Sequence, residues 1–236
     1  MKTSVNGIGM VAVALSAFAI IPACGTEEGV DSTPLKDATT AFAAPQSTAG
    51  DTTKACPTRP DLASPFSLAN GSWGSWQACY QLCPAGSFAY GTYLRSEVSQ
   101  GAGDDSALNG IQLDCFDRVS GAYTGFVTSK IGPWGTWGPR AVTNPWVVTN
   151  PIIGGQMKVE SPQGFSDDTA ANAVVLRAMN GTNSTPPVNT GWGTWQPLRT
   201  CGAGQAVCGV NTRVEASQGA DDDTSLNGIA FACCSF

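Results

Sequence analysis

Three copies of one sequence unit constrain the fold of this chain more than any other feature. Each copy opens with a Trp-Gly-x-Trp block, and the first tryptophans, Trp73, Trp134 and Trp192, are 61 and then 58 residues apart. A second block places a basic residue two positions before a glutamate and ends in Gln-Gly, and a third reads Asp-Asp-Ser/Thr-x-x-Asn. Because the three blocks keep their order in every copy, they predict three equivalent structural units.

The apolar runs inside these units are typical of β-strands. They are short and bounded by Gly, Pro, Asn and Asp, and no segment shows a convincing helical stripe. One unit cannot bury its own apolar face, whereas three sheets around a threefold axis can share a core. The clearest strand candidates are residues 87–94, 110–115, 205–214 and 228–234. We expect an all-β domain over residues 70–236, with repeats at about 70–120, 131–181 and 190–236.

Composition excludes several classes of function. The chain has 236 residues, 12 Lys plus Arg against 18 Asp plus Glu, and a net charge of -6, without a basic run that could hold a phosphate backbone. Nucleic acid is therefore not an expected partner. The chain has no histidine, which removes Ser-His and Cys-His nucleophile arrangements and the commonest metal ligand.

The N-terminal residues have the pattern of an export signal. Lys2 precedes an apolar run too short to span a bilayer, which predicts a signal peptide over residues 1–23. The following Ile21-Pro22-Ala23-Cys24 resembles a bacterial lipobox, and we expect Cys24 to be lipidated; an ordinary secretory signal cut near Ala23 is the alternative. Residues 24–69, rich in Thr, Ala, Ser, Pro and Gly, predict a flexible tether, except near Cys56, which needs a partner.

The three blocks together resemble the vitelline membrane outer layer protein I family over about residues 70–236. Members of that family carry Trp-Gly-x-Trp, then Glu with Gln-Gly, then Asp-Asp-Thr-Ala-x-Asn, three times. The resemblance implies a β-prism (β-prism I) with internal threefold pseudosymmetry, built from three Greek-key sheets. It also implies an extracellular role and an association with oligosaccharides of the N-acetylglucosamine type.

Eight cysteines remain once Cys24 is set aside, and the repeat reduces their 105 formal pairings. The second unit lacks the counterparts of both Cys83/Cys201 and Cys115/Cys233, which predicts the bonds Cys83–Cys115 and Cys201–Cys233. Cys234 faces the other side of its strand from Cys233, so it needs another partner. Cys208 is the cysteine left in that unit, and Cys56 pairs with Cys79 by elimination. A metal site is the weaker alternative, because no C-x-x-C is repeated.

The repeated carboxylates invite an enzymatic interpretation, because glycoside chemistry commonly uses two carboxyl groups. A catalytic centre is needed once, however, while a residue needed in every copy is more simply a turn or cap that satisfies backbone N–H groups. We therefore favour the structural interpretation. Calcium is a further alternative for the Asp-Asp pairs, but their spacing is not that of an EF-hand loop. The candidates are Glu97, Asp104, Asp105, Glu160, Asp167, Asp168, Glu215, Asp222 and Asp223.

The tryptophans and the basic residues of the repeats also have a structural and a functional interpretation. The repeated tryptophans are expected to pack in the core, whereas Trp146 lies in a stretch without a counterpart and is the first choice for an exposed contact. Arg95, Lys158 and Arg213 are expected to pair with the glutamates two residues later. Besides Trp146, the candidates for ligand contact are Asp105, Asp168, Asp223, Asn109, Asn172 and Asn227.

The family resemblance, taken together with these patterns, implies three candidate functions. The leading one is an exported, lipid-anchored, noncatalytic protein of the cell envelope that binds an amino-sugar polymer through loops at one end of the prism. The second is a glycosyl transferase or hydrolase that uses a Glu/Asp pair. The third is a structural or protein-interaction module of the envelope. We expect a monomer that needs no cofactor or metal.

Overall fold

The computed structural model describes residues 55–99, 106–142, 148–163, 169–183, 190–219 and 223–236. The chain divides into compact units Met1–Gln46 and Ser47–Phe236, and every described residue belongs to the second. The expected signal peptide, Cys24 and the tether up to residue 54 lie outside the described residues. The described part of the chain contains no helix, and so no helix that could cross a membrane.

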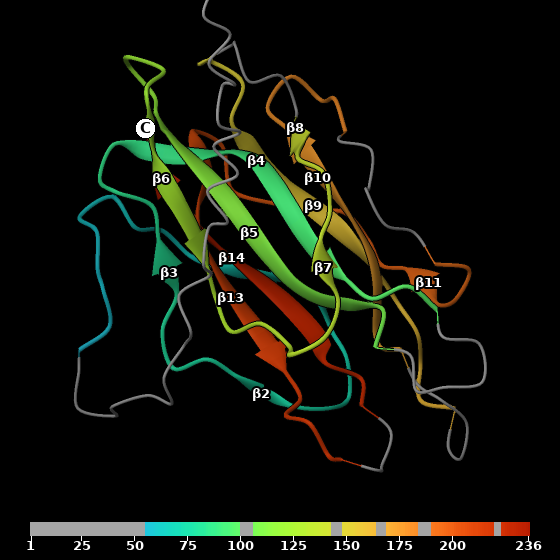
Figure 1. Cartoon of the computed structure of the whole chain (residues 1–236). Helices are drawn as coiled ribbons and strands as arrows, with labels where there is room; N and C mark the ends of the chain where they lie inside the picture. Colours follow the sequence, from blue (N-terminus) through green and yellow to red (C-terminus); the bar gives the residue numbers. More distant parts are fainter. Residues whose placement is uncertain (1–54, 100–105, 143–147, 164–168, 184–189, 220–222) are drawn as a thin grey trace, which may run out of the picture. The chain divides into compact units, whose positions relative to one another are not determined.

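Three antiparallel sheets make up the domain (Figure 1). Sheet A consists of β1 (Phe66–Asn70), β14 (Leu226–Ser235), β13 (Gln205–Val214), β2 (Ser75–Trp76) and β3 (Gln81–Leu82). Sheet B consists of β6 (Tyr123–Thr128), β5 (Leu108–Asp117), β4 (Ser87–Ser96), β7 (Thr136–Trp137) and β8 (Ala141–Val142). Sheet C consists of β10 (Ala171–Ala178), β9 (Ile152–Val159), β11 (Thr194–Trp195) and β12 (Arg199–Thr200). The long strands contain all four expected runs, which confirms the strand predictions.

The strand order of sheet B is that of a Greek key. Strands β4, β5 and β6 follow one another, and the chain then returns so that β7 and β8 lie beside β4. Because β7 and β8 begin the second repeat, sheet B contains strands of two repeats. Sheet C likewise takes β11 and β12 from the third repeat. An all-β prism of three antiparallel sheets agrees with the predicted fold class.

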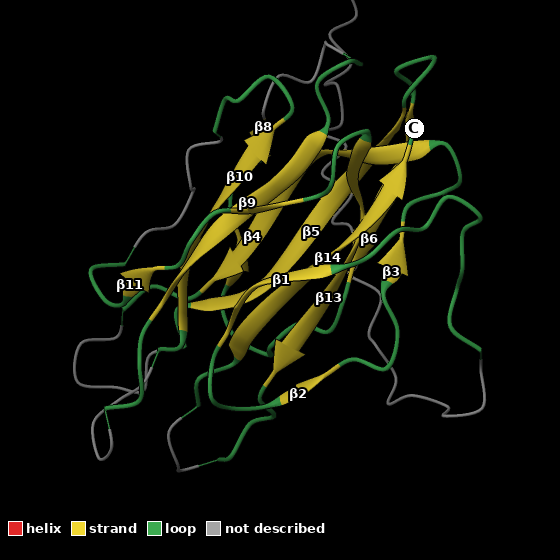
Figure 2. Ribbon diagram, turned by 180° about the vertical axis from the view of Figure 1, so that it is seen from behind, coloured by secondary structure: helices red, strands yellow, loops and turns green. Residues whose placement is uncertain are grey.

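The N-terminal strands complete the sheet that the C-terminal strands begin. β1 pairs with β14, and β2 and β3 pair with β13 (Figure 2). Residues 55–69 therefore belong to the domain and not to the expected tether. The sequence around β1 has no clear period and did not indicate a strand. The strand forms by pairing with β14, which lies about 160 residues away in the chain. Arg59, in the segment before β1, is only 7% exposed, which also indicates that this segment packs against the domain.

Aliphatic side chains from all three sheets fill the common core. None of the six tryptophans in the described ranges is among the fully buried residues, and Trp73 and Trp192 are 43% and 42% exposed. The expectation that the repeated tryptophans form the core is therefore wrong for these two. Branched aliphatic residues fill most of the core instead. They interdigitate between the sheets and, unlike tryptophan, have no side-chain N–H that would need a buried hydrogen-bond acceptor. The core includes Leu94, Ile111 and Leu113 of sheet B, Ile152, Met157 and Leu176 of sheet C, and Val210, Ile229 and Phe231 of sheet A.

Four disulfides fasten the strands and the N-terminal segment. They join Cys56 to Cys79, Cys83 to Cys115, Cys201 to Cys233, and Cys208 to Cys234. Comparison of the repeats predicts the second and third of these pairs, and the other two were predicted from the cysteines that remained. Disulfides persist in oxidising compartments, so the domain belongs outside the cytoplasm.

Candidate functional site

Each repeat contains a chain of three polar side chains, which we call the relay: a glutamate, a hydroxyl nine residues later and an asparagine three residues further on. In the first relay the Ser106 hydroxyl donates to Glu97 Oε2 at 2.7 Å and accepts from Asn109 Nδ2 at 2.7 Å. The second relay uses Glu160, Thr169 and Asn172, with both bonds at 2.6 Å. The third uses Glu215, Thr224 and Asn227. The glutamate of every unit thus accepts a bond from its own loop.

A residue in the left-handed conformation shapes each relay. Ala107, Ala170 and Ser225 follow the relay hydroxyl with φ of 49°, 46° and 52°. Their carbonyls accept the backbone N–H of the relay glutamate, at 2.8 Å in each unit. Small residues suit this conformation because a branched side chain would add to its cost. This geometry explains why the Ser/Thr-x-x-Asn spacing repeats, and it favours the structural interpretation of the glutamates.

The relay asparagines also join neighbouring repeats at one end of the prism. Asn227 Oδ1 accepts the backbone N–H of Trp73 at 3.0 Å, and Asn109 Oδ1 accepts the Ser225 hydroxyl at 2.7 Å. In the remaining unit, Thr190 donates to Asn172 Oδ1. All three asparagines are completely buried. These amides therefore hold the repeats together, and their full burial favours this structural role over the predicted ligand contact.

The basic residue before each relay binds the next Trp-Gly turn, and the expected ion pair with the glutamate is not formed. Arg95 donates to the carbonyls of Gly132, Pro133 and Gly135 at 2.9–3.1 Å. Arg213 donates to the carbonyls of the Gly71–Gly74 turn, and Lys158 to those of Thr190 and Gly191. The turn leaves several carbonyls unpaired within itself, and a long cation in the adjacent sheet strand can reach them.

The glycine of each Trp-Gly-x-Trp block is required by the same packing. Gly74, Gly135 and Gly193 have φ between 74° and 81°, and a Cβ at any of them would lie within 2.7 Å of backbone atoms in the adjacent long strand. The second tryptophan then covers a small residue of the sheet, as Trp76 does over Gly228. The first tryptophan is left at the surface beside the relays.

A shallow hollow lies where three repeats meet at this end, and its volume of about 170 Å³ includes open solvent. Trp73 comes from the first repeat, Glu160 from the second, and Thr224 with Asn227 from the third. Its remaining lining residues are Ser72, Pro162 and Ala170. The hollow therefore combines a half-exposed indole with the Glu160 carboxylate, two kinds of group that recognise a sugar ring. The Thr224 hydroxyl is buried and bonded within its own relay.

The predicted site residues fall into two groups. Glu97, Glu160, Glu215 and Asp223 are described; Asp223 is 3% exposed and accepts bonds from Gln218 N at 2.6 Å and Ser217 Oγ at 3.3 Å, as expected for a loop cap. The other candidates lie outside the described residues: Asp104, Asp105, Trp146, Asp167, Asp168 and Asp222. Within the described ranges, no group of three acidic or Cys side chains could hold a metal ion.

Trp73 and the residues beside it were missed as site residues. Their sequence context could have indicated exposure. The first tryptophan of each block is flanked by Gly, Ser or Pro, which are typical of surface turns. Only the tertiary structure distinguishes Trp73 from Trp192, which is equally exposed but does not line the hollow.

Several known proteins are similar to this chain. The family model "Vitelline membrane outer layer protein I (VOMI)" matches residues 65–236. A vitelline membrane outer layer protein 1 homolog of Mus musculus is 37% identical over 180 residues, which cover 74% of this chain and 85% of the mouse protein. The homolog of Homo sapiens is 36% identical over 168 residues, covering 70% of this chain and 79% of the human protein. Among solved structures, Calystegia sepium agglutinin matches with a TM-score of 0.49 and 9% identity, covering 74% of this chain and 98% of the agglutinin.

Proposed function

Since the chain belongs to the vitelline membrane outer layer protein I family, and the end of its prism exposes an indole beside polar groups, we propose that it is an extracellular protein that binds amino-sugar oligosaccharides without catalysis. One observation carries this proposal: Trp73, Glu160 and Thr224, from three different repeats, meet around one hollow.

The chemistry of these groups suits a pyranose with an N-acetyl group. The flat apolar side of the ring stacks on the exposed indole face of Trp73, which is 43% exposed. The Glu160 carboxylate accepts hydrogen bonds from ring hydroxyls or from an amide N–H. The hollow is shallow and its volume of about 170 Å³ includes open solvent, so a sugar unit lies against its rim on Trp73 and does not enter it. The rest of a sugar chain runs over the surface.

The relays support binding in preference to hydrolysis. A hydrolase needs a carboxylic acid and a carboxylate that flank the scissile bond. Here Glu97, Glu160 and Glu215 each accept a hydroxyl bond from their own loop, in the same geometry three times over. This threefold repetition is explained by folding and does not require a reaction.

The test is calorimetric titration of the domain with N-acetylchitohexaose. Trp73→Ala should weaken binding about tenfold, because a lost aromatic stacking contact of ~1 kcal/mol and its buried area combine. Trp192→Ala is the matched control, since Trp192 is 42% exposed and does not line the hollow. Equal affinities of the wild type and Trp73→Ala would contradict the proposed site. Shorter sugars detected by chromatography would support an enzyme, and the absence of binding would favour a structural module of the envelope.

We also propose that the chain reaches its compartment through a signal peptide over residues 1–23 and a lipid on Cys24. The four disulfides use eight of the nine cysteines, which leaves Cys24 for another chemistry. Mass spectrometry of the mature N-terminus tests this: a diacylglyceryl-cysteine at Cys24 is expected, and an unmodified N-terminus near Ala23 would indicate simple secretion.

A further inference from the structure

One patch on sheet B has no counterpart in the other repeats. It consists of Asp114 on β5, Arg140 just before β8, and the aromatic residues Phe116, Tyr123 and Phe126; we call it the sheet B patch. Asp114 aligns with Arg177 and Ala232 of the other units, when Cys115 is aligned with Ala178 and Cys233. A feature needed for the shared fold recurs in every repeat, so a feature present in one repeat calls for a different explanation.

An ion pair lies at the centre of the patch. Asp114 is 3% exposed, and its Oδ2 lies 2.6 Å from Arg140 Nε, while Gln112 Nε2 donates to its Oδ1 at 3.3 Å. Gly91 makes room for this pair, because a Cβ there would lie 3.0 Å from Arg140 Nε. Burying a carboxylate in mid-sheet is unfavourable unless its partners are fixed. At the equivalent place on sheet A, Ala232 is buried in an apolar cluster with Cys208 and Cys234.

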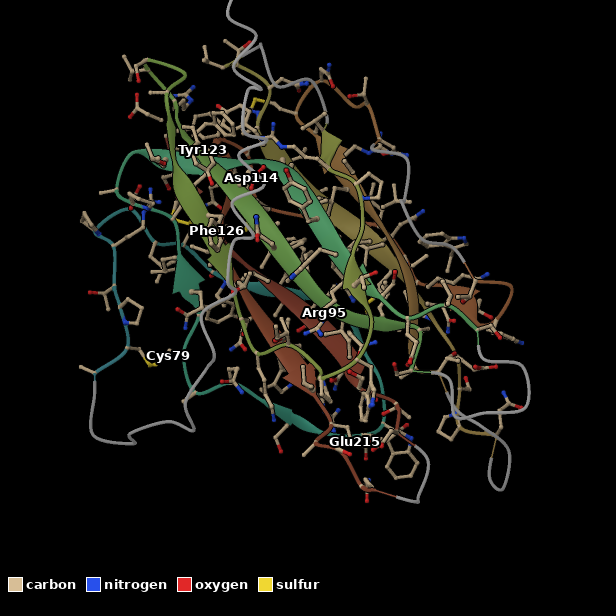
Figure 3. All side chains as sticks on the ribbon, in the orientation of Figure 1. Cys79, Arg95, Asp114, Tyr123, Phe126 and Glu215 are labelled. Atoms are coloured by element: carbon tan, nitrogen blue, oxygen red, sulfur yellow. A yellow bond between two sulfur atoms is a disulfide. The ribbon has the colours of Figure 1, made fainter. Side chains whose placement is uncertain are left out.

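Aromatic rings surround the ion pair and remain open to solvent. The Phe116 ring packs edge to face against Tyr123, with centroids 5.3 Å apart, and Arg140 lies 5.4 Å from the Phe116 centroid. Tyr123 is 55% exposed and Phe126 is 40% exposed. Figure 3 shows Asp114, Tyr123 and Phe126 together over β5 and β6, away from Glu215 at the other end of the domain. Exposed aromatic residues grouped around a polar centre are typical of a binding surface.

The charges indicate what kind of ligand fits. The Arg140 cation is neutralised by Asp114, so the patch offers no net charge to a phosphate, a carboxylate or an amine. It offers apolar ring faces together with hydrogen-bonding groups: the 31% exposed Arg140 side chain and the Tyr123 hydroxyl. Burial raises the pKa of Tyr123, and the Asp114 carboxylate raises it further, so this hydroxyl stays protonated at neutral pH and can donate. A neutral pyranose has the matching apolar face and hydroxyl edge.

We propose that the sheet B patch is a second saccharide-binding site, which stacks a neutral hexopyranose unit on Tyr123 and Phe126 and bonds its hydroxyls to the Tyr123 hydroxyl and to Arg140, which Asp114 holds in place. The proposal rests on the proposed function in one respect, namely that the ligand is a glycan. It adds that the domain is bivalent. Two separated sites let one domain hold two glycan chains, or two distant units of one chain, and thereby increase avidity.

Nuclear magnetic resonance distinguishes the two sites because each has its own ring signals. N-acetylchitohexaose and maltohexaose are titrated separately into the labelled domain, and the Trp73 indole and the Tyr123 and Phe126 rings are followed. We expect shifts at Tyr123 and Phe126 with at least one of the two sugars. The double variant Tyr123→Ala/Phe126→Ala should weaken that binding about tenfold or more while the Trp73 response is unchanged.

Two further variants keep the test independent of folding. Asp114→Asn preserves the size of the side chain and should weaken binding at the patch while the far-ultraviolet circular dichroism spectrum stays that of the wild type. Leu198→Ala is the matched control, because Leu198 aligns with Arg140 in the third repeat and is 42% exposed. Its binding should equal that of the wild type.

Each outcome decides between the two proposals. Shifts at Trp73 without shifts at Tyr123 and Phe126, up to millimolar sugar, would overturn the second site and leave the first. Shifts at Tyr123 and Phe126 alone would overturn the hollow as the site and leave the patch. No shift at either place with either sugar would overturn both.

Discussion

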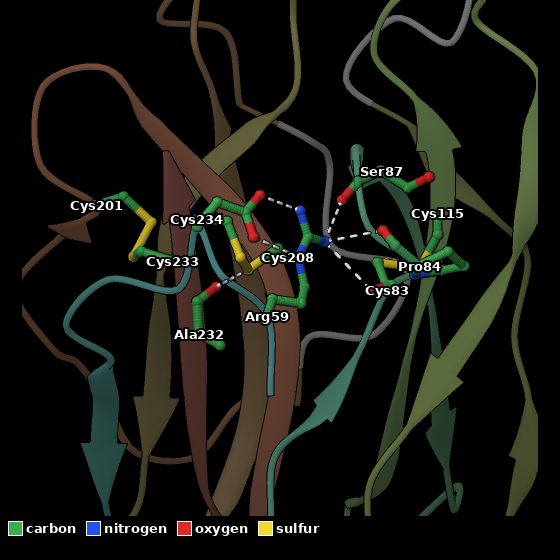
Figure 4. The surroundings of a disulfide bond; sticks show 11 residues. Arg59, Cys83, Pro84, Ser87, Cys115, Cys201, Cys208, Ala232, Cys233 and Cys234 are labelled. Carbon is green, nitrogen blue, oxygen red and sulfur yellow. Dashed lines mark hydrogen bonds and ion pairs between the residues drawn. A yellow bond between two sulfur atoms is a disulfide. The ribbon is translucent and has the colours of Figure 1, made fainter. Parts of the chain in front are cut away.

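Arg59 offers the most direct test of how the N-terminal segment is held. Its guanidinium donates from Nη1 to the carbonyls of Cys83, Pro84 and Ser87 at 3.2, 3.0 and 2.8 Å, and from Nε and Nη2 to the Asp61 carboxylate at 2.9 and 2.6 Å (Figure 4). Its side chain is 4% exposed. One arginine therefore connects the segment before β1 to the loop before β4.

The magnitude follows from these contacts. Arg59→Met keeps the length of the apolar stem and removes five hydrogen bonds, and it leaves buried carbonyls in need of another donor. A hydrogen bond to a charged group contributes about 1.5–3 kcal/mol to stability. The substitution also removes the desolvation cost of burying the guanidinium, which offsets part of the loss. We therefore expect a loss of ~3–5 kcal/mol in the free energy of unfolding, which corresponds to a melting temperature lower by about 10 °C in a domain of this size.

Guanidinium denaturation without reducing agent measures this loss, and hydrogen exchange of residues 55–65 shows whether the segment opens first. Arg199→Met is the matched control, because Arg199 is exposed on β12, and its effect should stay within about 0.5 kcal/mol. If Arg59→Met unfolded within 1 kcal/mol of the wild type, and exchange over residues 55–65 were unchanged, the reasoning would be refuted.

Three further predictions concern the turns, the acid response and the disulfides. Gly135→Ala should cost ~3 kcal/mol or more by denaturation, because a Cβ would lie 2.2 Å from a carbonyl oxygen, while Gly204→Ala, with similar φ and nothing within 4 Å, should cost only ~1 kcal/mol; equal losses would contradict the argument from close approach. Hydrogen bonding to Arg59 lowers the pKa of Asp61 from 3.8, so its stabilisation is present above pH 3.8 and is lost as the pH falls through the lower folded value. The difference in melting temperature between the wild type and Asp61→Asn should therefore shrink below about pH 4, and a constant difference would count against it. Replacing both Cys83 and Cys115 with Ala should lower the free energy of unfolding by ~2–5 kcal/mol, measured by thermal melts. An unchanged melting temperature would contradict the stabilising role of this disulfide.

Local sequence was sufficient to predict the repeated elements. Strand runs alternate with turn residues, so β4, β5, β13 and β14 could be located without coordinates. Two of the cysteine pairs could be deduced because both of their positions are missing in the second repeat, and the other two followed from the cysteines that remained. Repetition likewise indicated that the glutamates have a structural role. The relays give the reason, because each glutamate accepts a hydrogen bond from a hydroxyl of its own loop and donates its backbone N–H to the carbonyl of the left-handed residue.

The amino-acid sequence by itself determined the class of fold, the number of equivalent units and the bonds between cysteines, because these depend on short-range patterns and on comparison between copies. Only the tertiary structure decided that each Trp-Gly block joins the preceding sheet, that Arg95 binds a distant turn, and that Trp73 lies at a hollow while Asp114 meets Arg140. The physical reason is that the lateral order of strands is set by burial of the shared core and closure of the three sheets. Both depend on contacts between residues far apart in the chain, so the sequence of a single segment does not predict them.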